Sequence, residues 1–284
     1  MKLRVVGTVV CICFLLIFGL GVSQAYDIVW SQQPNVTPLQ GYAYSSEITN
    51  TVELSAVADD FKLDKIDDIA KIRWWGSYWN PNDGTQDYYP FYYSDHWSDP
   101  DTNPPSLVSK FQISIWTDKP AGTGMPRWGY PDTLLASKSY ELGTQVTEDN
   151  PTTINGPGFT QTVFQYEVDV DQAVDFPGLV LQEDQTYWIS IQAEEPVINN
   201  LIGEATYQWG WQNCIICPPP TPSNNAVQYG YVRGNGDINW WYELPGEGMA
   251  FELEIVPEPS SMVILAAGSM VFLSRKHRRK QRDK

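Results

Sequence analysis

Apolar and polar residues alternate along several short segments in the middle of the chain, and this pattern constrains the fold most strongly. Residues 164–170 read Phe-Gln-Tyr-Glu-Val-Asp-Val, and the same period of two recurs in 111–115, 187–193, 207–211, 227–231 and 249–255. Because successive side chains of a β-strand point to opposite faces, the pattern predicts strands with one buried and one solvated face. Such strands are typical of antiparallel sheets packed as a sandwich.

Segments rich in proline and glycine separate these strands, at 80–84, 99–106, 119–131, 151–158 and 217–225. None of them forces a domain boundary, and no strict internal repeat is present. We therefore expect residues 26–256 to form one all-β domain, an antiparallel, jelly-roll-like β-sandwich, with two small β domains as the alternative. Only Leu63 to Trp74 also permits a helix, and its Asp content and Trp pair favour a strand from Ala70 onward.

The charge of the chain is concentrated in this middle region. Residues 26–256 hold 32 acidic and 9 basic residues, a formal charge of −23 against −16 for the whole chain. This balance excludes nucleic-acid binding, because few bases are left to neutralise phosphates. All 12 Trp and all 16 Tyr also lie there, which argues against a disordered chain.

The N-terminal residues 1–25 have the order of a secretory signal peptide. Lys2 and Arg4 precede the apolar run Val5 to Leu20, and Val22-Ser23-Gln24-Ala25 ends in a small residue. This order predicts export through the secretion translocon and a signal peptidase cut before Tyr26. An uncleaved N-terminal anchor is the alternative.

The C-terminal residues 257–284 contain three features in a fixed order. Pro257, Glu258 and Pro259 precede a short apolar segment, 260–274, which is marginal for a full membrane span. A basic cluster in 275–284 would hold the end of that helix on the cytoplasmic side, through Arg275, Lys276, Arg278, Arg279 and Lys280. A plain tail anchor is the alternative interpretation of this arrangement.

The same three features resemble the PEP-CTERM sorting signal of Gram-negative bacteria. The resemblance implies that an exosortase-type transpeptidase cuts near Pro257-Glu258-Pro259. It also implies that the protein reaches the cell envelope surface or the extracellular space, with the C-terminal helix in the membrane only before processing. It implies a route and no activity.

A second resemblance covers most of residues 30–255. Asp59-Asp60-Phe61, followed by Trp75-Gly76-Ser77-Tyr78, is similar to an "ADDF … WGSW" block in uncharacterised secreted proteins of planctomycete-type bacteria. Phe111 to Trp116, Tyr187-Trp188-Ile189 and Trp209-Gly210-Trp211 are similar to later strands of that set. The set carries no established activity, so the resemblance supports the architecture alone.

Catalytic residues are not identifiable from the sequence. His96 is the only histidine in the sequence of the mature region. This argues against a Ser-His-Asp or Cys-His arrangement and excludes a His-rich zinc site. Asp59-Asp60 and Glu194-Glu195 are candidate carboxylate pairs for glycoside hydrolysis only because they lie at expected strand ends. Solvated charge is their simpler interpretation, and we expect a protein that is not an enzyme.

Cys214 and Cys217 form a Cys-Ile-Ile-Cys motif followed by three prolines. Zinc would need two more ligands, and no second pair exists. A redox site of the thioredoxin kind would lie at a helix N-terminus, which an all-β context does not offer. We expect a local disulfide between Cys214 and Cys217 in the oxidising exported location.

Aromatic residues are unusually dense in 74–97, where 10 of 24 positions are aromatic. Neighbours on a strand point to opposite faces, so the pairs in this segment cannot all point inward. Either loops fold over them as a satellite core, or they form an exposed platform that stacks on sugar rings. The candidate stacking residues are Trp74, Trp75, Trp79, Tyr88, Tyr92 and Trp97.

An acidic loop suggests calcium as the one cofactor worth considering. Asp99, Asp101 and Asn103 have the alternating oxygen spacing at the start of a calcium loop, with Asp95 nearby. The loop lacks the glycine and the distant glutamate of an EF-hand and has prolines instead. Alternating oxygen-bearing residues also arise by chance in an acidic domain.

Three functions fit these observations. The favoured one is a non-catalytic cell-surface or extracellular-matrix protein that binds extracellular polysaccharide through exposed aromatics. A purely structural envelope protein without a ligand and a carboxylate-based polysaccharide-active enzyme are the alternatives.

Overall fold

The computed structural model describes residues 26–37, 43–48, 54–64, 68–79, 108–122, 128–156, 159–194, 208–214, 225–230, 241–244 and 246–256. The chain from Ile28 to Ile255 forms one compact unit, separate from the two ends of the chain. The alternating segments, the aromatic residues of 74–79 and the Asp59-Asp60 pair all fall within that unit.

The first sheet is built around β5, which pairs with β14 and β11 along one side and with β9 along the other. Strand β1 extends the sheet beyond β14, β2 beyond β11, and β8 beyond β9. Strand β5 is antiparallel to β9, β11 and β14, as β2 is to β11 and β8 to β9. Its strands are β1 (Asp27–Gln32), β2 (Ala43–Ser45), β5 (Ile69–Trp79), β8 (Val146–Gly156), β9 (Phe159–Asp169), β11 (Gln208–Gln212) and β14 (Phe251–Ile255).

The second sheet has the strand order β13-β12-β4-β3-β10-β6-β7, and β4 also pairs directly with β10. Its pairings are antiparallel except for two residues of β3 that run parallel to β10. Its strands are β3 (Glu47–Ile48), β4 (Leu54–Lys62), β6 (Lys110–Lys119), β7 (Tyr130–Glu141), β10 (Thr186–Glu194), β12 (Val227–Gly230) and β13 (Trp241–Glu243). A four-residue helix, α2 (Gln172–Asp175), lies between β9 and β10 in the chain.

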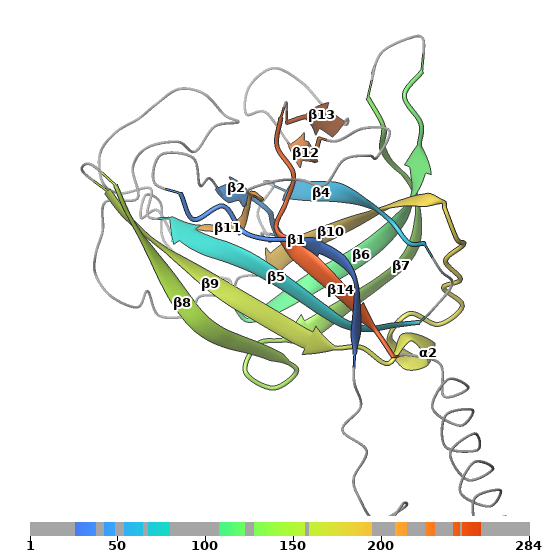
Figure 1. Ribbon diagram of the computed structural model, residues 1–284, viewed down its shortest axis with the longest axis horizontal. Helices are drawn as coiled ribbons and strands as arrows, with labels where there is room; N and C mark the ends of the chain where they lie inside the picture. Colours follow the sequence, from blue (N-terminus) through green and yellow to red (C-terminus); the bar gives the residue numbers. More distant parts are fainter. Residues whose placement is uncertain are drawn as a thin grey trace, which may run out of the picture. The chain divides into compact units, whose positions relative to one another are not determined.

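The core lies between the two sheets, which Figure 1 shows as two layers, with β5, β9 and β14 in front of β6 and β10. Trp74 of β5 meets Phe111 of β6 edge to face, with ring centroids 5.1 Å apart. Phe61 of β4 meets Phe251 of β14 in the same way at 6.4 Å. The expected all-β fold of two packed antiparallel sheets is therefore confirmed, while the jelly-roll-like strand order stays a prediction.

The alternating segments correspond to β6, β9, β10, β11, β12 and β14, so these strand predictions are confirmed. The region from Ala70 onward is also a strand, β5, as its Trp pair favours. The expected break at 151–158 is wrong in its first part, because β8 continues through Gly156. Strand β8 tolerates Pro151 because it lies outermost, paired only with β9, and its register shifts between Asp149 and Thr152.

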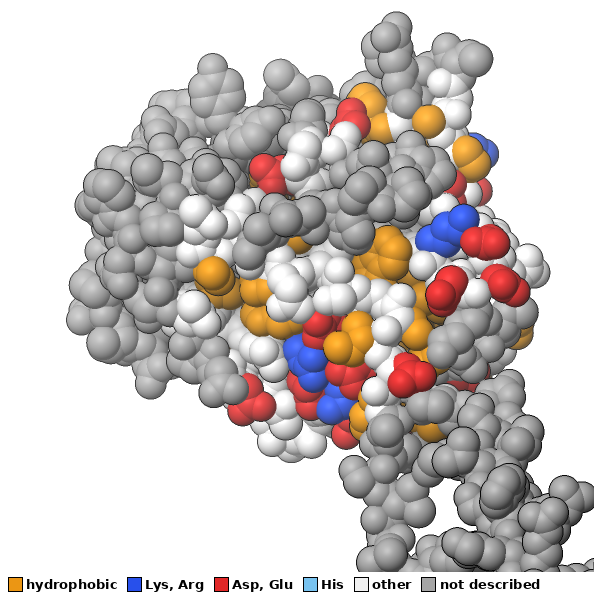
Figure 2. Space-filling model, viewed as in Figure 1, with side chains coloured by type: hydrophobic (Ala, Val, Ile, Leu, Met, Phe, Trp, Pro, Cys, Tyr) orange, Lys and Arg blue, Asp and Glu red, His pale blue; other side chains and the backbone are white. Residues whose placement is uncertain are grey.

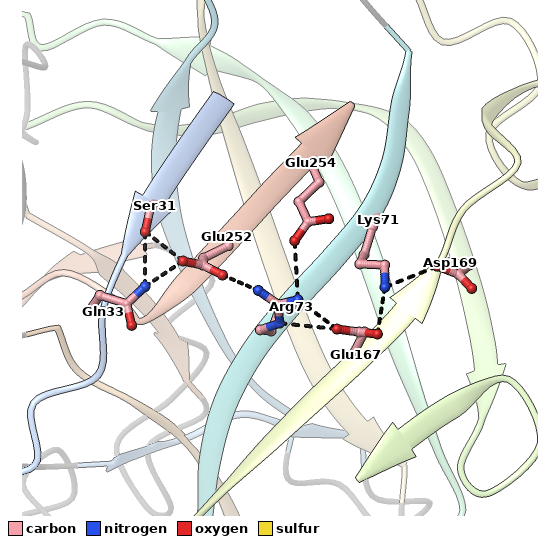
Figure 3. A network of polar contacts seen from close by, with 8 residues as sticks. All are labelled: Ser31, Gln33, Lys71, Arg73, Glu167, Asp169, Glu252 and Glu254. Atoms are coloured by element: carbon pink, nitrogen blue, oxygen red, sulfur yellow. Dashed lines mark hydrogen bonds and ion pairs between the residues drawn. The ribbon is translucent and has the colours of Figure 1, made fainter. Parts of the chain in front are cut away.

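A ladder of charged residues covers the outer face of the first sheet, where Figure 2 shows basic side chains set among acidic ones. Arg73 of β5 lies opposite Glu167 of β9 on one side and opposite Glu252 of β14 on the other. Its guanidinium donates to both carboxylates and pairs with Glu254 at 3.1 Å, as Figure 3 shows. Lys71 donates to Glu167 at 2.6 Å.

The side chains of the ladder favour their charged forms although they are partly shielded from water. Burial disfavours the charged forms, but hydrogen bonds and ion pairs with Glu167 outweigh it and raise the pKa of Lys71 and of Arg73. The same contacts lower the pKa of Glu167 against the effect of its burial. Ser31 of β1 and Gln33, which follows β1, add hydrogen bonds to Glu252, so the ladder links β1, β14, β5 and β9.

Candidate functional site

The outer face of the second sheet carries large aromatic side chains where a solvated strand face would carry polar ones. In β6, Phe111, Ile113 and Ile115 point into the core, so Trp116 points outward. In β10, Tyr187 and Ile189 point inward and Trp188 outward, and Trp188 lies directly opposite Trp116. The hydrophobic pattern of these strands therefore places two indoles side by side on the outside of the sandwich.

These two indoles belong to an aromatic band that crosses the second sheet. Trp241 of β13 meets Trp116 edge to face at 6.4 Å between ring centroids, and Tyr229 of β12 meets Trp241 at 5.4 Å with the rings inclined by 57°. Trp128, which precedes β7, donates from its indole nitrogen to the carbonyl oxygen of Trp241 at 3.3 Å. We define the aromatic band as Trp116, Trp128, Trp188, Tyr229 and Trp241.

The band has a buried floor and a partly exposed upper layer. Trp188 is fully buried together with Ala58 and Val227, and Trp116, Trp128 and Trp241 pack over them while staying partly exposed. Leu134 of β7, which lies opposite Trp116 in the register, continues this apolar surface with 48% of its area exposed. Trp116, Trp128 and Trp241 therefore have ring surface in contact with solvent, as a platform for an apolar sugar face requires.

Hydroxyl and amide groups continue the same outer face beside the band. Trp116 donates from its indole nitrogen to Ser190 Oγ at 3.1 Å. Ser114 and Ser137 share a hydrogen bond of 2.8 Å, and Gln112 donates to Ser137 at 2.8 Å. An aromatic surface bordered by hydroxyl and amide groups is the combination that binds sugars, since ring faces stack and polar groups bond hydroxyls.

Two carboxyl groups accompany Trp188. Asp118 accepts a hydrogen bond of 2.8 Å from the Trp188 indole, and Asp60 lies opposite Trp188 in the register of β4 and β10. Burial, with a smaller contribution from Asp132, raises the pKa of Asp118 although the Trp188 hydrogen bond lowers it. The band is therefore flanked by acidic groups.

The candidate pair Asp59-Asp60 does not form a two-carboxylate site in the described residues. Asp60 shares the outer face with Ala58, whereas Asp59 shares the inner face with Val57 and Phe61. Adjacent strand residues point to opposite faces, so the two carboxyl groups cannot act on one bond from the two sides of a cleft. Glu194 forms an ion pair with Lys110 at 3.0 Å, and Glu195 lies outside the described residues.

Asp59 lies instead between the sheets, where it is 1% exposed. It accepts hydrogen bonds from the backbone N–H of Met249 at 2.7 Å and of Asp60 at 2.9 Å. The Gln32 amide donates to it at 2.9 Å and to the Met249 carbonyl at 2.6 Å. Burial and then the charge of Asp60 raise the pKa of Asp59 well above its ordinary value, against the lowering effect of these hydrogen bonds.

The stacking residues expected from the sequence are not the ones that form the band. Trp74 is fully buried in the core and Trp75 is 8% exposed, so neither presents a ring face to solvent. Trp74 follows Ile72 by two residues on β5, so both side chains point to the inward face of the sheet. The side chain of Trp79 and the residues Tyr88, Tyr92 and Trp97 lie outside the described part of the chain.

The cysteine and calcium predictions fall largely outside the described residues. Cys214 is disulfide-bonded, and Cys217, its expected partner, is not among the residues that the structure describes. The same holds for Asp95, Asp99, Asp101 and Asn103 of the expected calcium loop. Within the described ranges, no group of three or more His, Cys, Asp or Glu residues is arranged to hold a metal ion.

Sequence reasoning missed the band although the pattern contained a signal for it. Trp116 follows the inward Ile115, and Trp188 stands between the inward Tyr187 and Ile189. Strict alternation therefore required both indoles to point outward. Trp128 and Trp241 lie outside the alternating segments, and only the strand order brings them and Tyr229 to the same face.

Comparisons with known proteins give two matches. The family model described as Domain of unknown function (DUF7901) matches residues 28–260, and the model described as PEP-CTERM protein-sorting motif matches residues 256–279. No curated protein and no solved structure matches the chain. In the described residues, no helix is long and apolar enough to cross a membrane.

The match at residues 256–279 confirms the sorting tail expected from Pro257, Glu258 and Pro259. The motif implies processing by an exosortase and sorting of an exported protein to the cell surface. The likeness to secreted proteins with an "ADDF … WGSW" block stays a prediction, as does the signal peptide at 1–25.

Proposed function

Since the chain belongs to the family described as Domain of unknown function (DUF7901) and carries a PEP-CTERM tail, we propose that it is a non-catalytic polysaccharide-binding protein of the cell surface or extracellular matrix. Polysaccharide would bind on the aromatic band of the second sheet. The translocon, signal peptidase and an exosortase would deliver it there, and the C-terminal helix would hold it in the membrane until processing.

The observation that carries the proposal is the partly exposed layer of the band. Trp116 and Trp241 lie 6.4 Å apart on the outside of a sheet whose opposite face already supplies the core. Large aromatic side chains on a solvated face are favoured where a ligand covers part of their area. Ser137 of β7, which is exposed, and Gln112 of β6, which is partly exposed, supply donors and acceptors for sugar hydroxyls on the same face.

A non-catalytic role is supported by the position of the acids near the band. Asp118 is engaged with the Trp188 indole, and Asp60 is 2% exposed. Glycoside hydrolysis needs two carboxyl groups on either side of the scissile bond, roughly 5–10 Å apart across an open groove. The arrangement of the described residues favours binding over cleavage.

The test is binding of the full-length protein to a panel of insoluble and gel-embedded polysaccharides. The variants are Trp116→Ala and Trp241→Ala, and the matched control is Trp30→Ala, a partly buried Trp on β1 of the other sheet that stacks on Phe251. We expect the band variants to lose about tenfold in affinity while the control binds like the wild type.

Circular dichroism of each variant establishes that it is folded before binding is compared. Absence of binding across the whole panel by the folded wild type would refute polysaccharide binding and leave the purely structural role. Release of sugar from any bound polysaccharide would refute the non-catalytic assignment instead.

A further inference from the structure

We propose that the aromatic band prefers polysaccharides with free amino groups over neutral and acidic ones. This inference rests on the proposed function and names the ligand class of the same site. It follows from the charges that surround the band and from the inclination of its rings.

Acidic groups lie on two sides of the floor of the band. Asp118 bonds the indole nitrogen of Trp188, and Asp60 of β4 lies opposite Trp188 on the other side of β10. Two strands thus bring carboxyl groups to the residue over which Trp116 and Trp241 pack. Asp118 is partly exposed, whereas Asp60 is 2% exposed, so a positively charged ligand on the band would meet the carboxyl group of Asp118.

The lysines of the same strands do not offset this charge. Lys119, next to Asp118, pairs with Asp132 at 3.9 Å, and Lys62 of β4 pairs with Asp184 at 3.0 Å. Among the described residues, each of these two lysines therefore already has an acidic partner other than Asp118. Burial, and to a smaller extent the charge of Asp132, raises the pKa of Asp118, so a nearby cation would lower that pKa and favour the charged carboxylate.

The rings of the band are also suited to a cation. The ring planes of Trp116 and Trp241 are inclined by 76°, and those of Tyr229 and Trp241 by 57°. Inclined rings present faces in different directions around one position, and an ammonium group is attracted to the face of Trp or Tyr. Neutral sugars would gain stacking only, and uronic acids would be repelled by the carboxyl groups and by a domain charge of −23.

Chitin and chitosan test the inference because they share one backbone and differ in whether the amino group is acetylated. Binding of the full-length protein to beads of each is measured at about pH 6, roughly two units above the ordinary Asp pKa, because the pKa of Asp118 is raised. We expect chitosan to bind about fivefold more tightly than chitin, and this advantage to shrink with added salt. Alginate, an acidic polysaccharide, should not bind.

The variant Asp118→Asn separates a local preference from the general attraction of an acidic protein to a polycation. Its side-chain oxygen can still accept the Trp188 hydrogen bond, so the band should keep its shape. We expect the preference for chitosan to fall about threefold while chitin binding stays unchanged. Asp149→Asn removes the same charge from exposed β8 of the first sheet and should leave the preference intact.

Equal binding of chitin and chitosan, with both lost in Trp116→Ala, would overturn the amine preference and leave polysaccharide binding standing. An equal loss of preference in Asp118→Asn and Asp149→Asn would overturn it as well, because the attraction would then come from net charge. Failure of the wild type to bind any polysaccharide would refute the proposed function and this inference together.

Discussion

Asp59 of β4 accepts a hydrogen bond from the backbone N–H of Met249, 2.7 Å away, across the interior of the sandwich. Asp59 belongs to the second sheet, whereas Met249 lies two residues before β14 of the first. Gln32, at the end of β1, bonds both partners and closes the link. A buried carboxyl group therefore ties the two layers together.

This link predicts a pH dependence of stability with a definite sign. The pKa of Asp59 is raised on folding, so the folded protein binds more protons than the unfolded chain above the ordinary Asp pKa of about 4. Stability must then fall as the pH rises from about 4 through the raised pKa. Asp59→Asn should remove this fall, because Asn is neutral throughout and its oxygen can still accept from Met249.

Urea unfolding at a series of pH values from about 4 to 8 measures the effect. Repulsion within an acidic domain also lowers stability as the pH rises, so a control must remove one charge without touching the link. Glu183→Gln, an exposed residue in the turn before β10, serves this purpose. The prediction would be contradicted if the free energy of unfolding changed with pH in the same way for Asp59→Asn and Glu183→Gln.

The charged ladder on the first sheet predicts a large loss of stability for Arg73→Met. Arg73 is the cation that contacts Glu252 and Glu254, whose side chains are 6% and 9% exposed. Removing one partner leaves carboxylates buried without compensation, which costs roughly 3–5 kcal/mol. We expect the lower end of this range, because the Arg73 side chain is itself 20% exposed and water can reach it.

Lys119→Met is the matched control for Arg73→Met. Its ion pair with Asp132 is long, at 3.9 Å, and both side chains are largely exposed. Exposed pairs contribute less than about 1 kcal/mol, so this variant should unfold near the wild-type urea concentration. If Arg73→Met also unfolded near the wild-type urea concentration, the ladder would not contribute to the stability of the folded protein.

Glu167 predicts a pH effect of the opposite sign. Burial tends to raise its pKa, but hydrogen bonds from Lys71 and Arg73 outweigh burial and lower it. Its contribution to stability is therefore present above the ordinary Glu pKa of about 4.3 and is lost as the pH falls through the lowered value. Glu167→Gln should be less stable than the wild type at neutral pH and should lose less of its stability on acidification.

Thermal unfolding followed by circular dichroism at about pH 3 and pH 7 compares the two proteins. Asp149→Asn, on the neighbouring strand β8, controls for the removal of one negative charge. A difference between wild type and Glu167→Gln that is equal at both pH values would show that its charge does not contribute.

The strands themselves could be predicted from local pattern, because alternation records which face of a strand is buried. Tyr187 and Ile189 alternate with Trp188, and β10 follows that pattern with its odd-numbered apolar residues in the core. Strand β8 was not predicted over its full length, because Pro151 is typical of a break between strands. The pairing with β9 shows that a register shift next to Pro151 accommodates it.

The candidate site could not be predicted to the same degree. Trp116 and Trp241 meet because β6 and β13 belong to one sheet, and strand order depends on pairings between distant segments that local pattern does not encode. The high density of aromatic residues in 74–97 indicated a stacking platform there instead. On β5 that density reflects core packing, since Trp74 lies between Phe111 and Tyr166.

The closest backbone approach in the core provides the last prediction. A Cβ atom added to Gly76 of β5 would lie 2.4 Å from Cζ2 of the Trp209 indole. Trp209 is fully buried and meets Phe111 at 5.1 Å and Tyr166 at 6.2 Å between ring centroids, so it cannot move aside without displacing them. Gly76→Ala should therefore destabilise the protein by roughly 1–3 kcal/mol through overpacking.

A double-mutant cycle with Trp209→Leu distinguishes this clash from the general cost of replacing a glycine in a strand. Trp209→Leu alone should lose roughly 3–5 kcal/mol through the cavity that it leaves, and that cavity makes room for the new methyl group. The free energies of unfolding in urea should then show the double variant more stable than the sum of the single losses predicts, by about 1–3 kcal/mol. Additive losses would mean that the Trp209 ring does not limit the residue at position 76, and the dense packing inferred for this corner of the core would be wrong.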